Sequence, residues 1–378
     1  MNDIRPTHLE VRLRQLEANY RAILDHTGGV PVMPILKANA YGHGLVPVAS
    51  LVANLGAPVI GLAYLEEGIA VRRAGIDVPI LILGGILGDQ IPQFLDHDLM
   101  LTASSLDKLQ AIEACAAARG TRAKVHLKVD TGMERIGVHW YSAEALLEAS
   151  LHATHVDVVG IFSHLARSED ADPAYTRLQT ERFAEVLSFY ERRSLPPPTR
   201  HLANSGAILN HPETWLDLTR PGLLLYGVSP TGDPPPIPVA PALTWVSRVV
   251  YFKVVKPGNP VSYGSTWAPE QWTRVVTLPL GYGDGYPRAL SNRADVLVRG
   301  RRYPIRGQVC MDQAMVEIGR DSAYNGDRVV VMGRMDGEEI TAHELAAHAG
   351  TIPYELLTGI NARVPRTYPD PPPGLIGV

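Results

Sequence analysis

Cysteine is scarce in this chain, and long apolar runs are missing. Among its 378 residues the only cysteines are Cys115 and Cys310, so neither a disulfide framework nor a four-ligand zinc site is expected, and we predict no metal. No stretch approaches the roughly 18 uninterrupted apolar residues that a membrane span needs, and residues 1–6 lack the apolar core of a signal peptide. We therefore expect a protein of the reducing cytoplasm that does not contact a membrane.

A strong excess of either charge is missing too. The 35 Lys and Arg residues face 39 Asp and Glu residues, for a net charge of −4, and this balance does not suggest a nucleic-acid partner. Hydrophobic residues make up 46% and charged residues 20%, which are ordinary values for a globular protein. A chain of 378 residues is too long for one ordinary core, so two domains are the default expectation.

Apolar runs alternate with helical patterns through the first two-thirds of the chain. Eight such runs occur, at 30–36, 59–64, 79–83, 99–102, 124–129, 156–163, 200–203 and 216–220. Continuous apolar strands that alternate with helices indicate a parallel sheet buried on both faces. Eight units in roughly 200 residues predict an α/β fold with an N-terminal (β/α)8 barrel. A doubly wound open sheet is the main alternative, although no G-x-G-x-x-G opens a helix here.

The character of the sequence changes at a proline-rich stretch, residues 229–241. We place the domain boundary there, with domains at 1–232 and 233–378, and leave open whether the first short strand, 7–11, joins the second domain. Short β-branched runs with glycine turns follow, the first of them at 243–255, and they predict a C-terminal mostly-β domain. Thr341 and Glu344 form a capping-box pattern that opens a helix.

Polar and glycine-rich residues follow the ends of several predicted strands. Because the chemistry of such barrels lies at the carboxyl ends of the strands, this pattern predicts an active site there. The residues concerned are Lys37, Asp130-Thr131-Gly132, Ser163-His164, Asn204-Ser205-Gly206 and Arg220-Pro221-Gly222.

Each of these residues also has an ordinary structural interpretation. A strand-ending lysine commonly just reaches water, but a buried and neutral Lys37 can form a Schiff base with a carbonyl group. Arg220-Pro221-Gly222 is either a plain strand-to-helix turn or a phosphate site on backbone N–H groups. His164 can stack on a ring, transfer a proton or serve the structure alone. Arg135 can clamp a carboxylate, whereas an unpaired ammonium on Lys128 is disfavoured in the barrel wall.

Taken together, the motifs resemble the alanine racemase family, in that family's order and across almost the whole chain. They are LKANAYGHG at 36–44, KVDTGM at 128–133, RPG at 220–222, VSYG at 261–264, GYGDG at 281–285 and CMDQ at 310–313. The resemblance implies dependence on pyridoxal 5′-phosphate and a head-to-tail homodimer with shared active sites. It also implies interconversion of L-alanine and D-alanine, which supplies D-alanine for peptidoglycan.

The resemblance further implies a role for individual residues. Lys37 would carry the cofactor and act as the base on the D-alanine side, and Tyr263 of the partner subunit would be the opposite base. Arg220 would face the pyridine nitrogen and keep it unprotonated, since an arginine only donates. Arg135 and the partner's Met311 would take the substrate carboxylate, and Lys128 matches a position that is often N-carboxylated. The remaining cofactor contacts would be Tyr41, His164, Asn204, Ser205, Gly222, Leu223 and Tyr354.

Rival interpretations predict other chemistry for the same barrel. A related pyridoxal-phosphate racemase or decarboxylase could act on another amino acid, but the decarboxylases usually lack the VSYG and CMDQ motifs in this arrangement. A non-catalytic pyridoxal-phosphate carrier would be a single barrel without a second domain. A hydrolase without cofactor would leave Lys37 and Arg220 unexplained. Cofactor colour and alanine turnover discriminate these possibilities.

Overall fold

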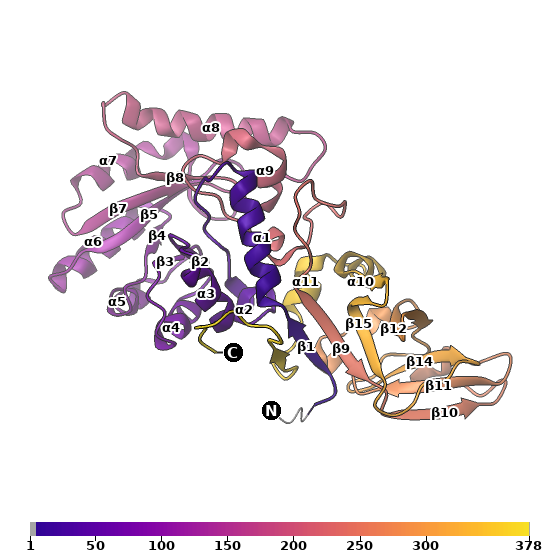
Figure 1. Ribbon diagram of the computed structural model, residues 1–378. Coiled ribbons are helices and arrows are strands. Elements are labelled where there is room, and N and C mark those ends of the chain that lie inside the picture. Colours follow the sequence, from indigo (N-terminus) through magenta and orange to yellow (C-terminus); the bar gives the residue numbers. More distant parts are fainter. Residues whose placement is uncertain (1–4, 378) are drawn as a thin grey trace.

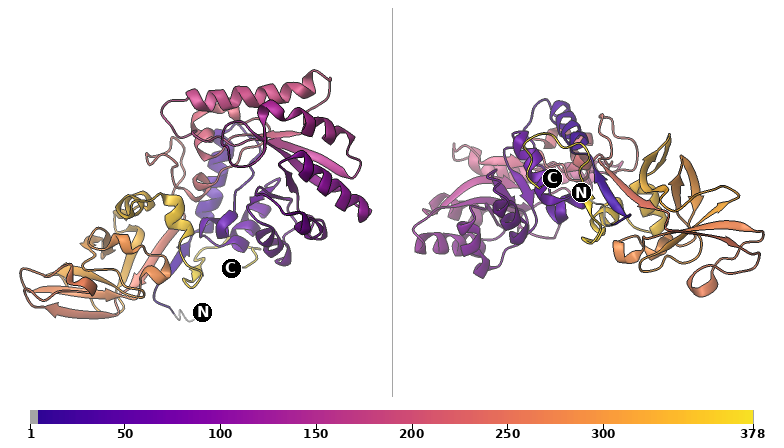
Figure 2. Two further views of the ribbon diagram at one scale, coloured as in Figure 1. Left: turned by 180° about the vertical axis from the view of Figure 1, so that it is seen from behind. Right: turned by 60° about the horizontal axis from the view of Figure 1, so that its bottom comes forward.

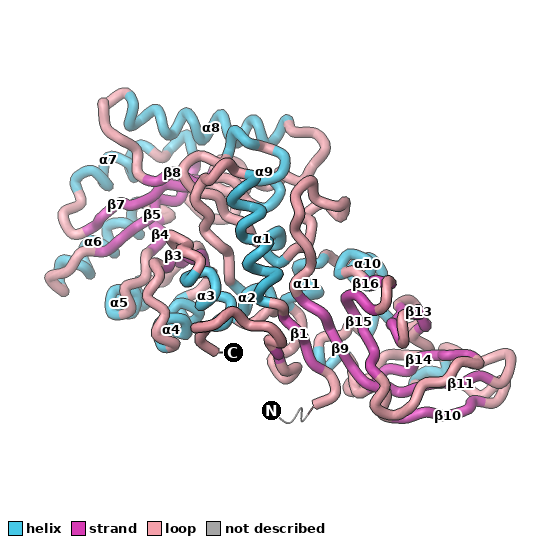
Figure 3. The backbone as a smooth tube through the Cα atoms, viewed as in Figure 1, coloured by secondary structure: helices cyan, strands magenta, loops and turns pink. Residues whose placement is uncertain are grey.

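A computed structural model describes residues 5–377 and divides them between two bodies (Figure 1). The first two-thirds of the chain form an α/β body, and the orange part of the chain with most of the yellow part forms a β-rich body that extends away from it in all three views (Figures 1 and 2). The yellow C-terminal tail returns to the barrel, where the Ile376 N–H donates to Ser50 at 2.9 Å. Helices surround the strands of the first body, whereas strands and loops dominate the second (Figure 3). No helix within the described residues is long and apolar enough to cross a membrane.

A closed ring of eight parallel segments forms the centre of the first body, as predicted. Six of them are strands: β2 (Ile60–Leu62), β3 (Ile80–Ile82), β4 (Leu101–Ala103), β5 (Ala123–Asp130), β7 (Val156–Phe162) and β8 (Thr199–His201). The first and last segments are joined by single bridges, Ile35 to Gly61 on β2 and Val32 to Thr219. The Met33 N–H donates to the Thr219 carbonyl at 2.8 Å, and the Asp217 N–H donates to the carbonyl of Arg200 in β8 at 3.1 Å, so the ring closes. β6 (Val138–His139) is a short addition beside β5.

Amphipathic helices cover the outside of this barrel. In α6 the Ser105 hydroxyl accepts the Lys108 N–H at 3.2 Å, and Leu109, Ile112 and Ala116 lie on the buried face. The helices are α1 (Leu13–His26), α3 (Leu45–Asn54), α4 (Leu65–Arg73), α5 (Ile91–Asp96), α6 (Leu106–Ala118), α7 (Glu144–His152), α8 (Ala174–Glu191) and α9 (Ser205–Asn210). Short 3₁₀ helices are η1 (Gly88–Gln90), η2 (Trp140–Ser142), η3 (Pro212–Thr214), η4 (Leu223–Tyr226), η5 (Tyr263–Ser265), η6 (Tyr282–Asp284) and η7 (Arg288–Leu290).

Two sheets build the second body. One has the order β13-β12-β15-β9-β1-β17, with β16 paired to β15, and the other has the order β10-β11-β14. The strands are β1 (His8–Val11), β9 (Leu243–Arg248), β10 (Tyr251–Val255), β11 (Thr273–Leu278), β12 (Asp295–Val298), β13 (Arg301–Pro304), β14 (Ala314–Gly319), β15 (Arg328–Met335), β16 (Glu338–Ile340) and β17 (Arg366–Thr367). The helices are α10 (Ala342–Ala349) and α11 (Pro353–Thr358).

The sequence predicts one continuous run at 243–255, and that prediction is wrong. It divides into β9 and β10, which lie in different sheets. At the break, the Val249 N–H donates to Asp327 and the Val250 N–H donates to Thr277, so the backbone leaves one ladder and enters the other. Both halves are β-branched and apolar, and for this reason the sequence alone shows no boundary between them.

The strand β1 connects the two bodies. It pairs antiparallel with β9, with Leu9 opposite Trp245, and parallel with β17, with Leu9 opposite Arg366. The chain then passes directly into α1 on the barrel (Figure 1). The strand β1, which comes from the N-terminal end of the sequence, thus lies between two strands of the C-terminal part of the chain. The proline-rich stretch 229–241 holds no helix or strand.

Candidate functional site

The carboxyl ends of the barrel segments surround one cavity of about 160 Å³. It brings together most of the residues singled out from the sequence, although they come from all parts of the barrel and from α11. The lining residues are Ile35, Lys37, Tyr41, Leu83, Lys128, Arg135, Ile136, Phe162, His164, Asn204, Ser205, Arg220, Gly222 and Tyr354. Leu223 lies fully buried directly after Gly222, at the start of η4. We refer to this space as the lysine cavity.

A left-handed turn follows Lys37. The five-residue element α2 (Lys37–Tyr41) has φ between 51° and 56° from Ala38 to Tyr41, a conformation that costs about 1–2 kcal/mol per non-glycine residue. The Ala40 N–H donates to the Leu36 carbonyl at 2.8 Å, and the Ala38 N–H donates to the Glu67 carboxylate at 2.6 Å. The sequence predicts a glycine-punctuated turn here but not its handedness, because local preference opposes it and packing imposes it.

The second body holds the same turn from outside. The Arg366 guanidinium donates to the Gly42 carbonyl at 3.1 Å, and the Tyr368 hydroxyl donates to the His43 carbonyl at 3.1 Å. A Cβ on Gly42 would lie 2.4 Å from the Leu357 carbonyl oxygen of α11, so only glycine permits this approach. The position of Lys37 therefore depends on residues more than 300 positions further along the chain.

Positive charge dominates the lysine cavity. Lys37, Lys128, Arg135 and Arg220 line it, and no carboxylate does. Burial and the charge of Arg135 lower the pKa of Lys37, which favours the neutral and nucleophilic amine. Burial and Arg220 hold the pKa of Lys128 well below its usual value, and its Nζ lies 4.3 Å from the centre of the Phe162 ring. Two arginines with no carboxylate among the described lining residues make this a site for an anionic ligand.

Arg220 lies at the floor of the cavity and is only 4% exposed. Its Nη2 donates to the carbonyls of Ser163 and Leu202, both at 2.8 Å, and its Nη1 donates to Nδ1 of His201 at 2.9 Å. Burial lowers the pKa of Arg220 to about 9. Its Nη2 also lies 3.4 Å from Nδ1 of His164.

A second buried histidine continues this chain of hydrogen bonds. Because an arginine cannot accept, Nδ1 of His201 is the acceptor and its Nε2 carries the proton. That Nε2 donates to Nδ1 of His126 at 2.9 Å. Burial and Arg220 hold the pKa of both histidines below the usual value, so both stay neutral. Sequence reasoning missed these two residues, although the two-residue period of β5 places His126 on the inward face with Lys128.

The turn after Arg220 forms a cradle for a small anion. Asn204 caps α9 through its side-chain oxygen, which accepts the Ala207 N–H at 3.1 Å. The Ser205 hydroxyl oxygen accepts the Gly222 N–H at 2.9 Å, which ties α9 to the turn before η4. A Cβ on Gly222 would lie 2.5 Å from the Tyr41 hydroxyl, so the absence of a side chain keeps this corner open.

Two predicted residues do not reach the lysine cavity of their own chain. Tyr263 and Met311 lie on the second body, 72% and 54% exposed. The turns that carry them are adjacent, since the Ser262 hydroxyl donates to the Gln308 carbonyl at 2.6 Å. Tyr263 follows Ser262, whose φ of +68° is unusual for a residue other than glycine. The two side chains therefore belong to one exposed face of the second body.

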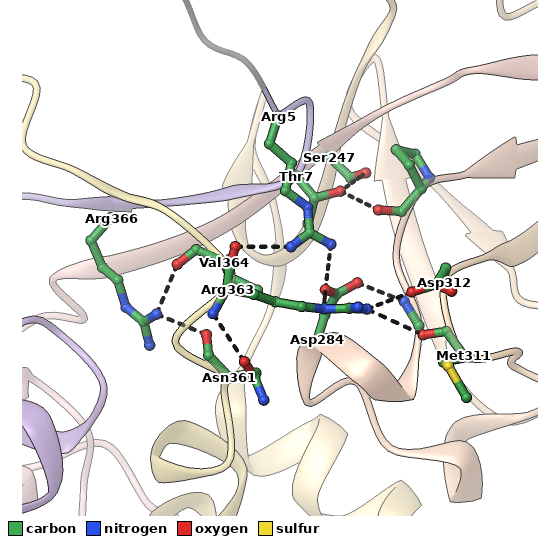
Figure 4. A network of polar contacts seen from close by, with 12 residues as sticks. Arg5, Thr7, Ser247, Asp284, Met311, Asp312, Asn361, Arg363, Val364 and Arg366 are labelled. Carbon is green, nitrogen blue, oxygen red and sulfur yellow. Dashed lines mark hydrogen bonds and ion pairs between the residues drawn. The ribbon is translucent and has the colours of Figure 1, made fainter.

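An arginine from the end of the chain holds the backbone beside Met311 (Figure 4). Nη2 of Arg363 donates to the Asp312 carboxylate at 2.7 Å, and its Nε donates to the Asp284 carboxylate at 2.7 Å. Arg5 donates to the other side of this network, to Asp284 and to the Arg363 carbonyl. Sequence reasoning gave no role to Arg363 or Asp284, because residues so distant in the sequence carry no local signal of contact.

Comparison with known proteins places these features in a family. Residues 11–230 match the family model described as alanine racemase, N-terminal domain, and residues 242–368 match the model described as alanine racemase, C-terminal domain. Curated relatives include the alanine racemase of Symbiobacterium thermophilum, 44% identical over 97% of this chain and 98% of the relative. The alanine racemase of Carboxydothermus hydrogenoformans is 42% identical over 97% and 100%.

Solved structures agree with the fold. The alanine racemase of Streptomyces lavendulae is 36% identical and superimposes with a TM-score of 0.92 over 97% of both chains. The alanine racemase of Bacillus anthracis, solved with bound L-Ala-P, is 33% identical with a TM-score of 0.91 over 99% of this chain and 97% of that one.

Proposed function

This chain belongs to the alanine racemase family, and from that premise we propose that the lysine cavity is its active site. The protein interconverts L-alanine and D-alanine and depends on pyridoxal 5′-phosphate. The observation that carries the assignment of the site is the set of four basic side chains, two of them arginines, without a lining carboxylate among the described residues. The cofactor phosphate and the substrate carboxylate are the anions that this charge suits.

The residues present fit the cofactor. A neutral amine at Lys37 would suit its aldehyde, a glycine corner at Gly222 its phosphate, and a donor-only side chain at Arg220 its ring nitrogen. When bound, pyridoxal phosphate delocalises the negative charge that loss of the α-proton leaves on the substrate. Lys37 would hold the cofactor through Nζ and then take or return the proton on the D-alanine side.

Arg220 would limit the strength of the electron sink. The guanidinium is strongly basic and only donates, and its bonds to two carbonyls and to His201 fix its direction, so it would donate a hydrogen bond to the ring nitrogen while keeping its own proton. A ring nitrogen kept unprotonated withdraws less charge, which disfavours side reactions such as transamination. His164 would lie against the ring.

The phosphate would lie in the cradle after Arg220. The Ser205 hydroxyl, whose oxygen accepts the Gly222 N–H, would donate its own proton to the phosphate, and the backbone at Gly222 and Leu223 would hold it from the other side. The remaining donors would be Tyr41, Asn204 and Tyr354, which all line the cavity.

A second subunit would complete the site. Tyr263 of the partner subunit would be the base on the L-alanine side, and the partner's Met311 would join Arg135 at the substrate carboxylate. The proposal rests on the exposure of these residues and on their shared face, and it requires a head-to-tail homodimer. Sedimentation analysis that found only monomer in the active enzyme would contradict it.

Lys128 would be N-carboxylated. Its amine is buried, and although the charge of Asp130 favours the ammonium, burial, Arg220 and Arg135 together hold its pKa well below the usual value. Addition of CO₂ to Nζ with loss of one proton gives an anion that could pair with Arg135. A carbon-13 carbamate signal from protein supplied with labelled bicarbonate, absent in Lys128→Met, tests this modification.

Two further expectations remain part of the proposal. The domain boundary at residues 232 and 233 lies within the irregular stretch 229–241, where limited proteolysis is expected to cut first. The protein is expected to work in the cytoplasm, in the supply of D-alanine for peptidoglycan, with its free cysteines reduced. Cell fractionation tests the location.

The direct test of the site combines colour with turnover. The purified protein should be yellow and should convert L-alanine to D-alanine, and Lys37→Ala should lose both the covalent absorbance band and the activity. A Lys37→Ala variant that racemised alanine at the normal rate would overturn the assignment. Lys124→Ala is a suitable control, because Lys124 lies on β5 at the surface.

A further inference from the structure

The residues on either side of Lys37 are bound by one neighbouring unit of the barrel, the strand β2 with the helix α4 that follows it. Before the lysine, the Leu36 N–H donates to the Gly61 carbonyl of β2 at 2.9 Å. After the lysine, the Ala38 N–H donates to the carboxylate of Glu67, in the first turn of α4, at 2.6 Å. The backbone of Lys37 is therefore held between two hydrogen bonds to the same unit.

The Glu67 carboxylate joins two segments of backbone. Its Oε1 accepts the Ala38 N–H, whereas its Oε2 accepts the Ala63 N–H at 2.9 Å and the Tyr64 N–H at 3.3 Å. The bond to Tyr64 is that of an ordinary capping glutamate, which binds the backbone just before its own helix. Capping does not explain the bond to Ala38, which lies 29 residues away in the sequence and outside α4. Glu67 thus connects the corner between β2 and α4 to the turn that carries Lys37.

The turn that carries Lys37 depends on support from outside. Residues 38–41 all have a left-handed φ although none of them is glycine, and such a conformation persists only where surrounding contacts impose it. Arg366 supports the far end of the turn by donating to the Gly42 carbonyl. Glu67 supports the end next to Lys37, so it helps to fix the direction in which the Lys37 side chain enters the lysine cavity.

The Glu67 carboxylate also acts on Lys37 through its charge. Burial and the charge of Arg135 lower the pKa of Lys37, whereas the charge of Glu67 acts in the opposite direction. Glu67 is not among the described residues that line the lysine cavity, so it acts on a reaction there through Lys37 and not by contact with a ligand. An amine that takes up a proton becomes an ammonium, and a nearby carboxylate stabilises that charged form.

We propose that Glu67 is a positioning residue for the reaction at Lys37: its carboxylate holds the left-handed turn and places a negative charge near the Lys37 amine. This inference rests on the proposed function, in which Lys37 holds the cofactor and moves the proton on the D-alanine side. A glutamine in place of Glu67 carries no charge and offers one acceptor oxygen. The paired N–H groups of Ala63 and Tyr64 take that oxygen, so the amide NH₂ faces the Ala38 N–H and the bond is lost.

Glu67→Gln tests the proposal, with Glu66→Gln as its matched control. Both glutamates lie in the first turn of α4, so each substitution removes one negative charge from the same helix end. In the cofactor-free protein, hydrogen exchange of the Ala38 amide should be roughly tenfold faster in Glu67→Gln, because a hydrogen bond to a charged acceptor is lost. Exchange in Glu66→Gln should equal that of the wild type. Equal exchange in the two variants would exclude a role of Glu67 in holding the turn.

The effect of the charge is measured when pyridoxal phosphate is added to the cofactor-free protein and the covalent absorbance band develops. Because this step needs the neutral amine of Lys37, its pH profile should move toward lower pH in Glu67→Gln and stay in place in Glu66→Gln. A purely structural loss would slow the step at every pH without moving the profile, and that result would exclude the role of the charge. The other titratable side chains around Lys37 are the same in all variants, namely Tyr41, Lys128, Arg135, His164, Arg220 and Tyr354.

Isotope effects connect Glu67 to the proton transfer itself. The deuterium isotope effect on racemisation should increase in Glu67→Gln for α-deuterated D-alanine, whose deuteron Lys37 would take. It should not increase for α-deuterated L-alanine, since the partner's Tyr263 would take that deuteron. An equal increase for both substrates would indicate general damage to the site and would overturn the positioning role.

Glu67→Asp gives a second measurement if Glu67→Gln does not fold. It keeps the charge but is one methylene shorter, so exchange of the Ala38 amide should become faster while the pH profile stays near that of the wild type. Wild-type exchange in Glu67→Asp would overturn the proposal. The proposed function fails in a different way, through a wild-type protein without the covalent band or an active Lys37→Ala. Failure of the present inference alone leaves the wild-type band and turnover intact, with Glu67→Gln indistinguishable from Glu66→Gln.

Discussion

Arg220 donates from Nη1 to Nδ1 of His201 across 2.9 Å, beneath the lysine cavity. This one contact determines the tautomer of His201, and through it that of His126, because arginine has no acceptor. Nη1 and Nη2 of Arg220 and Nε2 of His201 each donate to an acceptor, so the guanidinium keeps its direction with no carboxylate partner among the described residues. The direction in which Arg220 would face the nitrogen of the cofactor ring therefore depends on His126 of β5 and His201 of β8.

Arg220→Lys should destabilise the holoenzyme and slow racemisation. An ammonium cannot span the Ser163 and Leu202 carbonyls and His201 together, and leaving buried acceptors unpaired should cost about 2–3 kcal/mol of unfolding free energy. Urea unfolding measures the loss. Arg200→Lys, at a half-exposed pair with Asp217, should change stability by less than about 1 kcal/mol. Equal effects of the two substitutions would contradict the importance of the buried contacts.

Tyr263→Phe should reduce L-to-D turnover by about 10²–10⁴-fold, because a general base contributes a factor of that size. Assays in both directions, with chiral analysis of the product, measure the effect. Tyr251→Phe, at an exposed position on β10, is the control and should retain full activity. Full activity of Tyr263→Phe as an intact dimer would exclude Tyr263 as the base.

Mixed dimers test whether the site is shared. Neither Lys37→Ala nor Tyr263→Ala should be active alone, but a heterodimer of the two has one site with both intact residues. Activity should return on mixing after reversible dissociation of the subunits. If no activity returned although heterodimers were present, both bases would have to come from one chain.

The stability of the cofactor-free protein in carbon dioxide-free buffer should rise with pH because of Lys128. Burial and Arg220 hold its pKa in the folded state well below the usual value, so at intermediate pH the folded state binds fewer protons than the unfolded state. The unfolding free energy therefore increases as pH rises toward the unfolded pKa. Lys128→Met should flatten this rise in urea titrations between pH 7 and pH 9.5, roughly the range in which the lysine states differ. Lys124→Met, on the same strand at the surface, should leave the slope unchanged.

Arg363→Met should raise KM for alanine several-fold and leave cofactor affinity nearly unchanged. Its guanidinium connects Asp284 and Asp312, and so holds the backbone at Met311 (Figure 4). Neither Arg363 nor Met311 lines the lysine cavity of its own chain. Arg299→Met removes an exposed pair with Asp327 and should leave KM as it is. A change in cofactor affinity alone would show that Arg363 acts elsewhere.

Much of the barrel could be predicted because its signals are local. Each apolar run ends at a polar or glycine-rich residue, and in a closed parallel barrel all these ends meet at one edge. This rule alone brings Lys37, Arg135 and Arg220 together, and the cavity contains all three. The sequence does not predict the break between β9 and β10, because the two strands differ in the strands they pair with and not in the type of residue they contain.

The sequence by itself determined the order of strands and helices, the lysine at a strand end and the motifs of the alanine racemase family, since periodicity and spacing are properties of the chain. Only the tertiary structure decided the left-handed turn after Lys37, the neutral state that burial favours for its amine, and the histidines behind Arg220. It also decided that Tyr263 lies exposed and away from Lys37 of the same chain. These features depend on burial, and on contacts between residues far apart in sequence, whose energies exceed the local preferences of the backbone.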